Sequence, residues 1–466
     1  MGLVLFAIIS GVIGGLVRGL HDEPDWRAFV KETSYMWEHR ETGPWTGMFG
    51  YLPAASFLLW PFTVWLPRPM GLMAFALTNG AAAVGAAWIL FRWWSVDSAG
   101  AEGGRPSGTS KLALFGWPLF LLGAHFQNVL QGNQPTIILL FLCIAGLTLI
   151  QLKRNWTGGF LLGVATCLKV TPGILLVFML LKRRWSAAAG MVLTMVMLDI
   201  VPSATLFGID GAIREHKAWL QRVEWYSNRR FIEDPWLRVM HHGHEHNTSL
   251  SVVLTRWLRE QPGTGRHIVV RGDPSDEELK VIRSAMLPGD HLSIDPMPTS
   301  GDRDAVSYHE AEARRRLPRN SIANWSADRV YILWLLIEAA VSAFAVLITL
   351  GSRGPAESPE AWQSQAGLWL LVSMWPSPML RDYYLPLSLP AAVIVWRTVL
   401  ACRSSEKLGA ATFTSIAALV SCFVSVLCLA SDIAEWYGVH FFALATLTMA
   451  TMSICRQPER LDRPAQ

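Results

Sequence analysis

The chain has 466 residues, of which 52% are apolar and 16% are charged, and its formal net charge is +4. This composition is too apolar for a soluble protein of that length, and runs of roughly 18–20 apolar residues, enough to span a bilayer, recur along it. We therefore predict an all-α polytopic membrane protein. No basic patch is interleaved with aromatic residues, so nucleic acid is not an expected partner.

Residues 2–20 are predicted to form a retained first helix, because no small-residue cleavage site of a signal peptide follows them. A long first outer loop, 18–69, comes next. Within it, 51–66 reads YLPAASFLLWPFTVWL, which is short and carries Pro53 and Pro61. We interpret this stretch as a juxtamembrane helix in the outer leaflet, where its tryptophans suit the interface.

Two short basic turns, Lys153-Arg154 and Lys182-Arg183-Arg184, enclose only residues 157–181. Basic short loops favour the cytoplasm, so the chain is expected to go out and come back between them. Each arm then has about 12 residues, or roughly 18 Å of helix. Because Pro172-Gly173 breaks the helical pattern, Lys169 is predicted to lie at the tip of a broken hairpin.

The other membrane segments follow by alternating outward and inward crossings from these two cytoplasmic turns, which places both termini inside. They are 70–92, 112–127, 135–152, 186–208, 329–352, 366–380, 384–402, 409–430 and 435–454, and with the first helix and the two hairpin arms they give about 12. A competing arrangement makes 51–66 a span and 157–181 one long helix with Lys169 midway. It also gives about 12 segments, but it places Lys153-Arg154 outside.

This topology divides the chain into three parts. Residues 1–208 form a membrane module that includes the first outer loop, and 329–466 supply the C-terminal transmembrane helices. Between them lies a large later outer loop, 209–328. Its stretch 260–318 is dense in charge and is expected to form a small soluble subdomain or a partly mobile excursion.

Four polar clusters from separate parts of the chain reach the outer face in this topology. They combine carboxylates, amides, cations and phenols, which suit a lipid phosphate and the deprotonation of a hydroxyl. The clusters are HDEPDW with Asp22, Glu23 and Asp25; QGNQPT with Asn133 and Gln134; Lys169 at its hairpin tip; and SPMLRDYY with Arg381, Asp382, Tyr383 and Tyr384.

An ordered set of motifs, spread over most of 15–400, resembles glycosyltransferase family 87, a polytopic group of the GT-C superfamily. GGFLLGVATCLKVTPGILLVFMLLKRRW is the most similar stretch, covering a Gly-rich arm, Leu-Lys-x-x-Pro and a basic end. The others are DWRAFVKETSYMWEH, GYLPAASFLLWPF with Tyr51, QGNQPTIILLFL, HNTSLSVVLTRWL with Asn247, and WPSPMLRDYYLPL.

The resemblance implies a GT-C-type bundle and a metal-independent, cofactor-free, inverting transfer on the extracytoplasmic face of the cell membrane. The donor would be a polyprenyl-phosphate sugar, mannose in the first place, and the acceptor a lipid or glycan hydroxyl. Carried over by position, Asp25 would be the general base and Lys169 would bind the donor phosphate. Arg381 is a second expected phosphate ligand. Further substrate contacts are expected from Asp22, Tyr51, Asn133, Gln134, Asp382, Tyr383, Tyr384 and Asn247.

Each of these residues also has a plainer interpretation. Asp25, Asn133, Gln134 or Asn247 could cap a helix, Lys169 could snorkel to headgroups, and the tyrosines could belong to an aromatic belt. Arg381 could be an interface anchor with Asp382 as its partner. Asp22 and Glu23 are close rivals of Asp25 for the role of the base. The histidine-rich HHGHEHN, His241–His246, has ligands too densely spaced for the usual zinc site, so no functional metal is expected.

Two rival functions remain open. A transporter or flippase of a lipid-linked sugar or anion would use the same cations without a base, although transporters often carry paired broken helices and only one broken hairpin is evident. A non-catalytic scaffold would bind a partner through 209–328. Incorporation of sugar into a covalent product discriminates these from a transferase.

Overall fold

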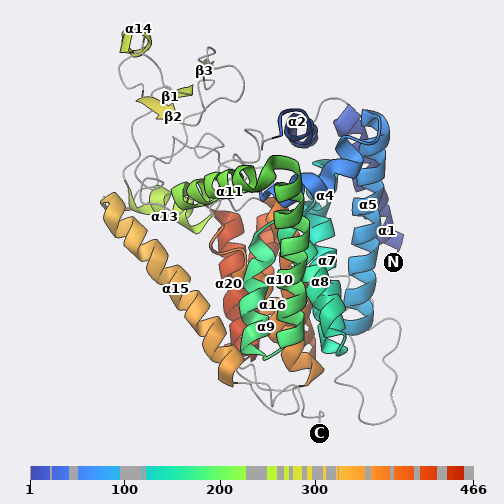
Figure 1. Cartoon of the computed structure of the whole chain (residues 1–466). Coiled ribbons are helices and arrows are strands. Elements are labelled where there is room, and N and C mark those ends of the chain that lie inside the picture. Colours follow the sequence, from blue (N-terminus) through green and yellow to red (C-terminus); the bar gives the residue numbers. More distant parts are fainter. Residues whose placement is uncertain are drawn as a thin grey trace.

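The structure of the chain is a computed structural model. It describes residues 2–20, 24–40, 51–94, 118, 122–226, 249–259, 267–271, 276–285, 291–295, 308–310, 322–323, 325–351, 358–377, 382–402, 410–427 and 438–455. In this part of the chain an upright helical bundle has several helices lying across one end (Figure 1). The helical character predicted from the composition is therefore confirmed.

The first half of the chain supplies one side of the bundle. Its elements are α1 (Gly2–Leu20), α2 (Pro24–His39), α4 (Pro53–Thr63), α5 (Arg68–Ile89) with the π-helical turn η1 (Leu90–Trp94), a helix over 122–131, α7 (Thr136–Gln151), α8 (Asn155–Leu168), η2 (Thr171–Ile174), α9 (Leu175–Leu181), α10 (Trp185–Met195), the π-helical turn η3 (Val196–Ile200) and α11 (Val201–Tyr226).

The second half contributes the remaining helices and a small sheet. They are α13 (Leu250–Leu258), β1 (His267–Arg271), α14 (Asp276–Ala285), β2 (His291–Asp295), β3 (Tyr308–Glu310), α15 (Ala327–Gly351), α16 (Pro359–Val372), the 3-10 helix η4 (Asp382–Ser388), α17 (Leu389–Cys402), α18 (Ala410–Leu427) and α20 (Val439–Cys455).

Three helical stretches of the described residues are long and apolar enough to cross a membrane alone: Arg68–Arg92, Trp185–Gln221 and Ala327–Gly351. The pair Leu122–Gln131 and Thr136–Gln151, which is bent by 120°, meets the same criteria only when its two helices are taken together as one span. The count of about 12 segments stays a prediction. α4 has 11 residues and is not one of the long helices.

The predicted hairpin is present. α8 and α10 run parallel, because Gly159 lies against Ala187 and Gly163 lies against Met191 and Thr194. The turns before α8 and before α10 therefore lie at one end of the bundle, which we call the basic end, and Lys169 lies at the other end of α8. The competing arrangement with one helix over 157–181 is wrong, because α8 ends at Leu168 and a 3-10 turn begins at Thr171.

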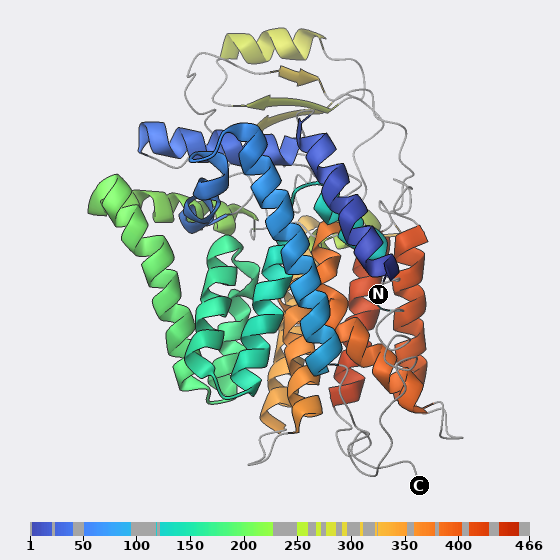
Figure 2. The ribbon, with the colours of Figure 1, turned by 90° about the vertical axis from the view of Figure 1, so that its right-hand side faces the viewer.

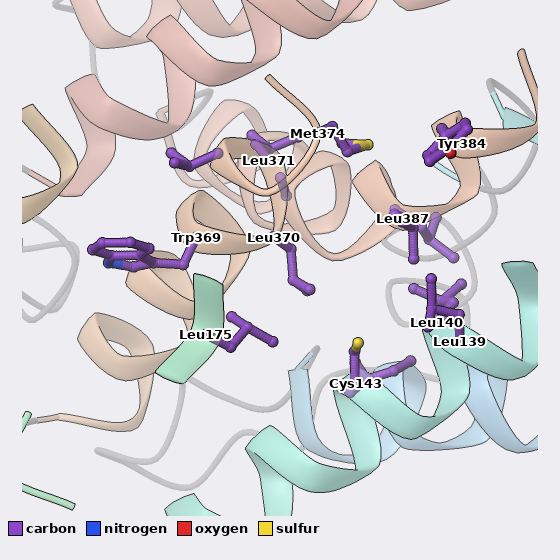
Figure 3. Packing of buried hydrophobic residues seen from close by; sticks show 14 of the residues in the cluster. Leu139, Leu140, Cys143, Leu175, Trp369, Leu370, Leu371, Met374, Tyr384 and Leu387 are labelled. Carbon is purple, nitrogen blue, oxygen red and sulfur yellow. The ribbon is translucent and has the colours of Figure 1, made fainter. Parts of the chain in front are cut away.

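The glycines of α8 explain how these helices approach so closely. A Cβ atom on Gly159 would lie 2.1 Å from the carbonyl oxygen of Ala187, nearer than real Cβ contacts allow. Small residues let membrane helices pack backbone to backbone. A buried apolar cluster joins α7, α9, α16 and η4 to this packing, with Leu140, Leu175 and Trp369 among its members (Figure 3).

The end of the bundle opposite the basic end is covered by α2, α4 and residues 209–226 of α11, which we call the roof (Figures 1 and 2). α11 changes direction at Gly208, whose φ of 72° is a left-handed conformation that glycine adopts without strain. The predicted span over 186–208 thus ends at this kink. Beyond the roof lies a small unit from the later outer loop.

That unit corrects one aspect of the predicted fold class. The all-α prediction did not include strands, but β1, β2 and β3 form a mixed three-stranded sheet in the order β2-β1-β3. β1 and β2 are parallel and are joined through α14, as a parallel connection requires. The described part of the later loop therefore contains paired strands and a helix, while its folding as a separate subdomain stays a prediction.

Candidate functional site

Lys169 occupies the tip of the hairpin, where the backbone leaves the helix. Its φ and ψ of −157° and 128° are extended, and its amide still donates to the carbonyl of Ala165 at 3.0 Å. Pro172 follows three residues later, and proline both removes a backbone donor and clashes with the preceding turn of a helix. The sequence thus ends α8 beneath the roof and leaves Lys169 at that end.

The ammonium of Lys169 lies between two aromatic rings. Its Nζ is 3.6 Å from the ring centroid of Tyr384 and 5.7 Å from that of Tyr51, and the side chain is only 6% exposed. A cation held over an aromatic face away from water gains about 2 kcal/mol. Three distant segments, namely the first outer loop, the hairpin and the turn before α17, therefore meet at one buried cation.

The roof helix α2 reaches the same place. The ring of Phe29 makes an edge contact with that of Tyr51, with centroids 5.8 Å apart, and Trp26 packs on Phe75 at 5.2 Å. Asp25 is in the first turn of α2, one turn before Phe29. Helical spacing puts position 25 on the same stripe as the buried positions 29, 32 and 36.

Two buried carboxylates were missed in the sequence. Glu32 lies on α2 and is 5% exposed, and Asp199 lies in η3 and is 6% exposed. The signal for Asp199 was present, because a carboxylate inside the apolar run MVLTMVMLDIV is as unusual as Lys169 in its own run. The signal for Glu32 was its spacing, seven residues after Asp25 on one helix.

Asn133 and Gln134 are buried, but Asn133 has a structural partner. Its Nδ2 donates to the carbonyl of Gly15 at 2.8 Å, and its φ of 49° is left-handed, so it fastens the QGNQPT turn to α1. Neither residue caps α7 with its side chain, because the N-cap of α7 is Pro135 and no side-chain cap bond forms there. The alternative of a helix cap at Asn133 is therefore wrong.

Several predicted residues are not placed. Asp22, Arg381, Asn247 and the histidines His241–His246 lie outside the described residues. Asp382 and Tyr383 are the first two residues of η4, directly before Tyr384, and only their backbone is described. Within the described residues no group of three or more His, Cys, Asp or Glu side chains could hold a metal ion.

The fold and the site together define a helical membrane protein that encloses a buried lysine between tyrosines under a helical roof. Residues 49–267 match the model of glycosyltransferase family 87, and this match indicates a glycosyltransferase. No curated protein and no solved structure matches the chain. The matched region contains Tyr51 and Lys169, whereas Asp25 and Tyr384 lie on either side of it.

Proposed function

We propose that the protein transfers a sugar, mannose in the first place, from a polyprenyl-phosphate donor to a hydroxyl of a lipid or glycan. The observation that carries this proposal is the burial of Lys169 between Tyr51 and Tyr384. A buried cation is costly unless it has an anionic or aromatic partner. A phosphate held at the end of a lipid chain is an anion that can reach such a position from the bilayer.

The chemistry assigns opposite tasks to the two charged groups. The carboxylate of Asp25 takes the proton of the acceptor hydroxyl, and the resulting oxygen forms a bond to the anomeric carbon. The bond from that carbon to the phosphate oxygen breaks, and its electron pair leaves with the polyprenyl phosphate. Lys169 stabilises this leaving charge, with Arg381 as a second phosphate ligand. Attack from the face opposite the phosphate inverts the anomeric configuration without a metal.

The same topology supports a location for the reaction. The basic end carries Lys153, Arg154, Lys182, Arg183 and Arg184, and short basic turns favour the cytoplasm. The roof and Lys169 then belong to the extracytoplasmic side of the cell membrane, and the donor enters from the surrounding lipid. Asp22, Asp382, Tyr383, Gln134 and Asn247 remain proposed substrate contacts.

The test is a product analysis with purified protein in lipid nanodiscs. Labelled polyprenyl-phosphate mannose, and then other polyprenyl-phosphate sugars, are offered with lipid and glycan acceptors. We expect K169M and D25N each to lower turnover roughly 10²- to 10³-fold, the usual loss when a charge-stabilising group is removed. K153M, at the basic end, and D276N, on α14, are matched controls that should retain wild-type turnover.

Three results would contradict parts of this proposal. In a companion experiment with the protein reconstituted into sealed vesicles, label that crosses the membrane without entering a covalent product would make the protein a transporter. Full turnover in K169M would remove the phosphate role of Lys169. If D25N keeps its turnover while E32Q loses it, Glu32 is the base and the assignment of Asp25 is wrong.

A further inference from the structure

A buried carboxylate in η3 joins three elements around the hairpin tip. Oδ1 of Asp199 accepts a hydrogen bond from the backbone N–H of Ala54 at 2.9 Å, and Oδ2 lies 2.9 Å from Nε2 of His216. Ala54 is in the first turn of α4, where backbone N–H groups have no partner within the helix. The residue before α4 provides no side-chain cap, so Asp199 caps this helix from another part of the chain.

The hydrogen bonds of His216 favour its charged form. Nδ1 lies 2.8 Å from the carbonyl oxygen of Ala212, and a carbonyl can only accept, so Nδ1 carries a proton. Nε2 faces Oδ2 of Asp199, and the side-chain hydrogen bond between them raises the pKa of His216, against a smaller lowering by burial. The arrangement therefore favours the imidazolium, in which both ring nitrogens can donate.

Other titratable groups around this pair have lesser roles. On α11 itself, Glu215 is buried, forms a 3.2 Å ion pair with Arg214 and raises the pKa of His216 slightly. Cys167 of α8 also lies near Asp199. Ala54 of α4 and Leu52, the residue before this helix, also lie in this region and do not titrate. Asp199 is thus the main charge partner of His216.

The pair lies beside the Tyr51–Lys169 contact. Leu52, Ala54 and Cys167 form one buried apolar cluster, and Trp219 of the roof packs on it. Tyr51 precedes Ala54 by three residues, and Lys169 follows Cys167 by two. The elements that carry the two site residues are therefore held together at the place where Asp199 fastens α4 and α11.

We infer that Asp199 and His216 are positioning residues for the glycosyl transfer, because together they hold the start of α4 and the folded-back part of α11 so that Tyr51 stays against Lys169. This inference rests on the proposed function. It adds two residues that act through the backbone of α4 and through α11, without touching the substrate.

The inference has a pH signature. A histidine whose pKa is raised in the folded protein contributes stability that is complete below its unfolded pKa of about 6.5. This stability is lost as the pH rises through the folded value. The hold on α4 should therefore weaken in alkali. In D199N this pH dependence should be reversed. The amide oxygen still accepts from the N–H of Ala54, but the amide nitrogen donates to the neutral imidazole of His216 and repels the imidazolium.

Two measurements test the inference across the range from about pH 5.5 to about pH 9. The first is hydrogen exchange, corrected for intrinsic rates, of the peptide that contains Ala54. The second is kcat and KM for transfer from labelled polyprenyl-phosphate mannose. D199N, H216Q and the control D210N, which changes an exposed carboxylate on α11, are compared with the wild-type protein in nanodiscs.

We expect wild-type exchange at Ala54 to rise, and wild-type kcat to fall, as the pH increases. In H216Q, exchange at Ala54 and kcat should lose this dependence on pH. In D199N the dependence should be reversed, so that exchange rises and kcat falls as the pH decreases. At neutral pH kcat of H216Q should fall roughly 10- to 100-fold, the usual effect of misplacing a site by about an ångström, with KM changed less. D210N should match the wild type in both measurements.

The outcomes separate the inference from the proposed function. Unchanged exchange at Ala54 in both D199N and H216Q would overturn the inference. If D199N and H216Q exchange faster at Ala54 but have the same kcat as the control D210N, the positioning role is overturned. The proposed function then still stands, as long as K169M is inactive. A wild-type protein that forms no covalent product would overturn the proposed function, and the positioning role falls with it.

Discussion

The contact between α8 and α10 permits a specific stability prediction. In Gly159→Ala the new Cβ atom would lie 2.1 Å from the carbonyl oxygen of Ala187, whereas real contacts stay above 3.0 Å, so the two backbones must separate by at least 3.0 − 2.1 = 0.9 Å. The atom that must move belongs to backbone, so no side chain can turn away. Overpacking of this kind costs about 1–3 kcal/mol.

The control is Gly123→Ala, because a Cβ atom at Gly123 meets nothing within 4 Å. Both variants gain up to about 1 kcal/mol of helix propensity, so their difference isolates the clash. Thermal unfolding in detergent, followed by tryptophan emission, should place G159A on the order of 2–10 °C below G123A. Transfer should fall as well, since α8 ends at Lys169. Equal unfolding temperatures for the two variants would refute the close packing of α8 on α10.

Two further predictions concern the contact between Tyr384 and Lys169 and the hairpin. Tyr384→Leu removes the ring that lies 3.6 Å from Nζ of Lys169 and should lower transfer by about 5- to 30-fold, whereas Tyr384→Phe keeps the ring and should lose less; equal loss in both would assign the effect to the hydroxyl. Asn155→Cys and Ser186→Cys, in a background without other reactive cysteines, should react with an impermeant maleimide from the same side of sealed vesicles, because both positions follow turns at the basic end. Labelling from opposite sides would contradict the hairpin.

Much of the architecture was predictable because its signals are local. The end of α8 follows from Pro172, and the short α4 follows from the length and prolines of 51–66. Predicted segments such as 329–352 and 409–430 correspond to α15 and α18 within a few residues. Apolar length and helix breakers act within a single segment, so they can be read before the segments are assembled.

The small sheet was not predicted because its pairing is not local. β1 pairs with both β2 and β3, and β3 begins 41 residues after β1 begins (308 − 267). The 120° bend between Leu122–Gln131 and Thr136–Gln151, by contrast, lies at the QGNQPT turn, where the predicted segments 112–127 and 135–152 meet. Charge density alone indicated a folded unit without indicating strands.

The sequence by itself determined that the protein is helical and membrane-embedded, that its chain turns back at Pro172-Gly173, and that Lys169 lies at that turn. Tertiary structure decided which residues surround this lysine. Tyr384 is 215 positions away in the chain (384 − 169), and Ala54 and Asp199 are separated by 145. Such contacts depend on the register of packed helices. Close packing at glycines and buried hydrogen bonds establish this register only when the whole bundle has assembled.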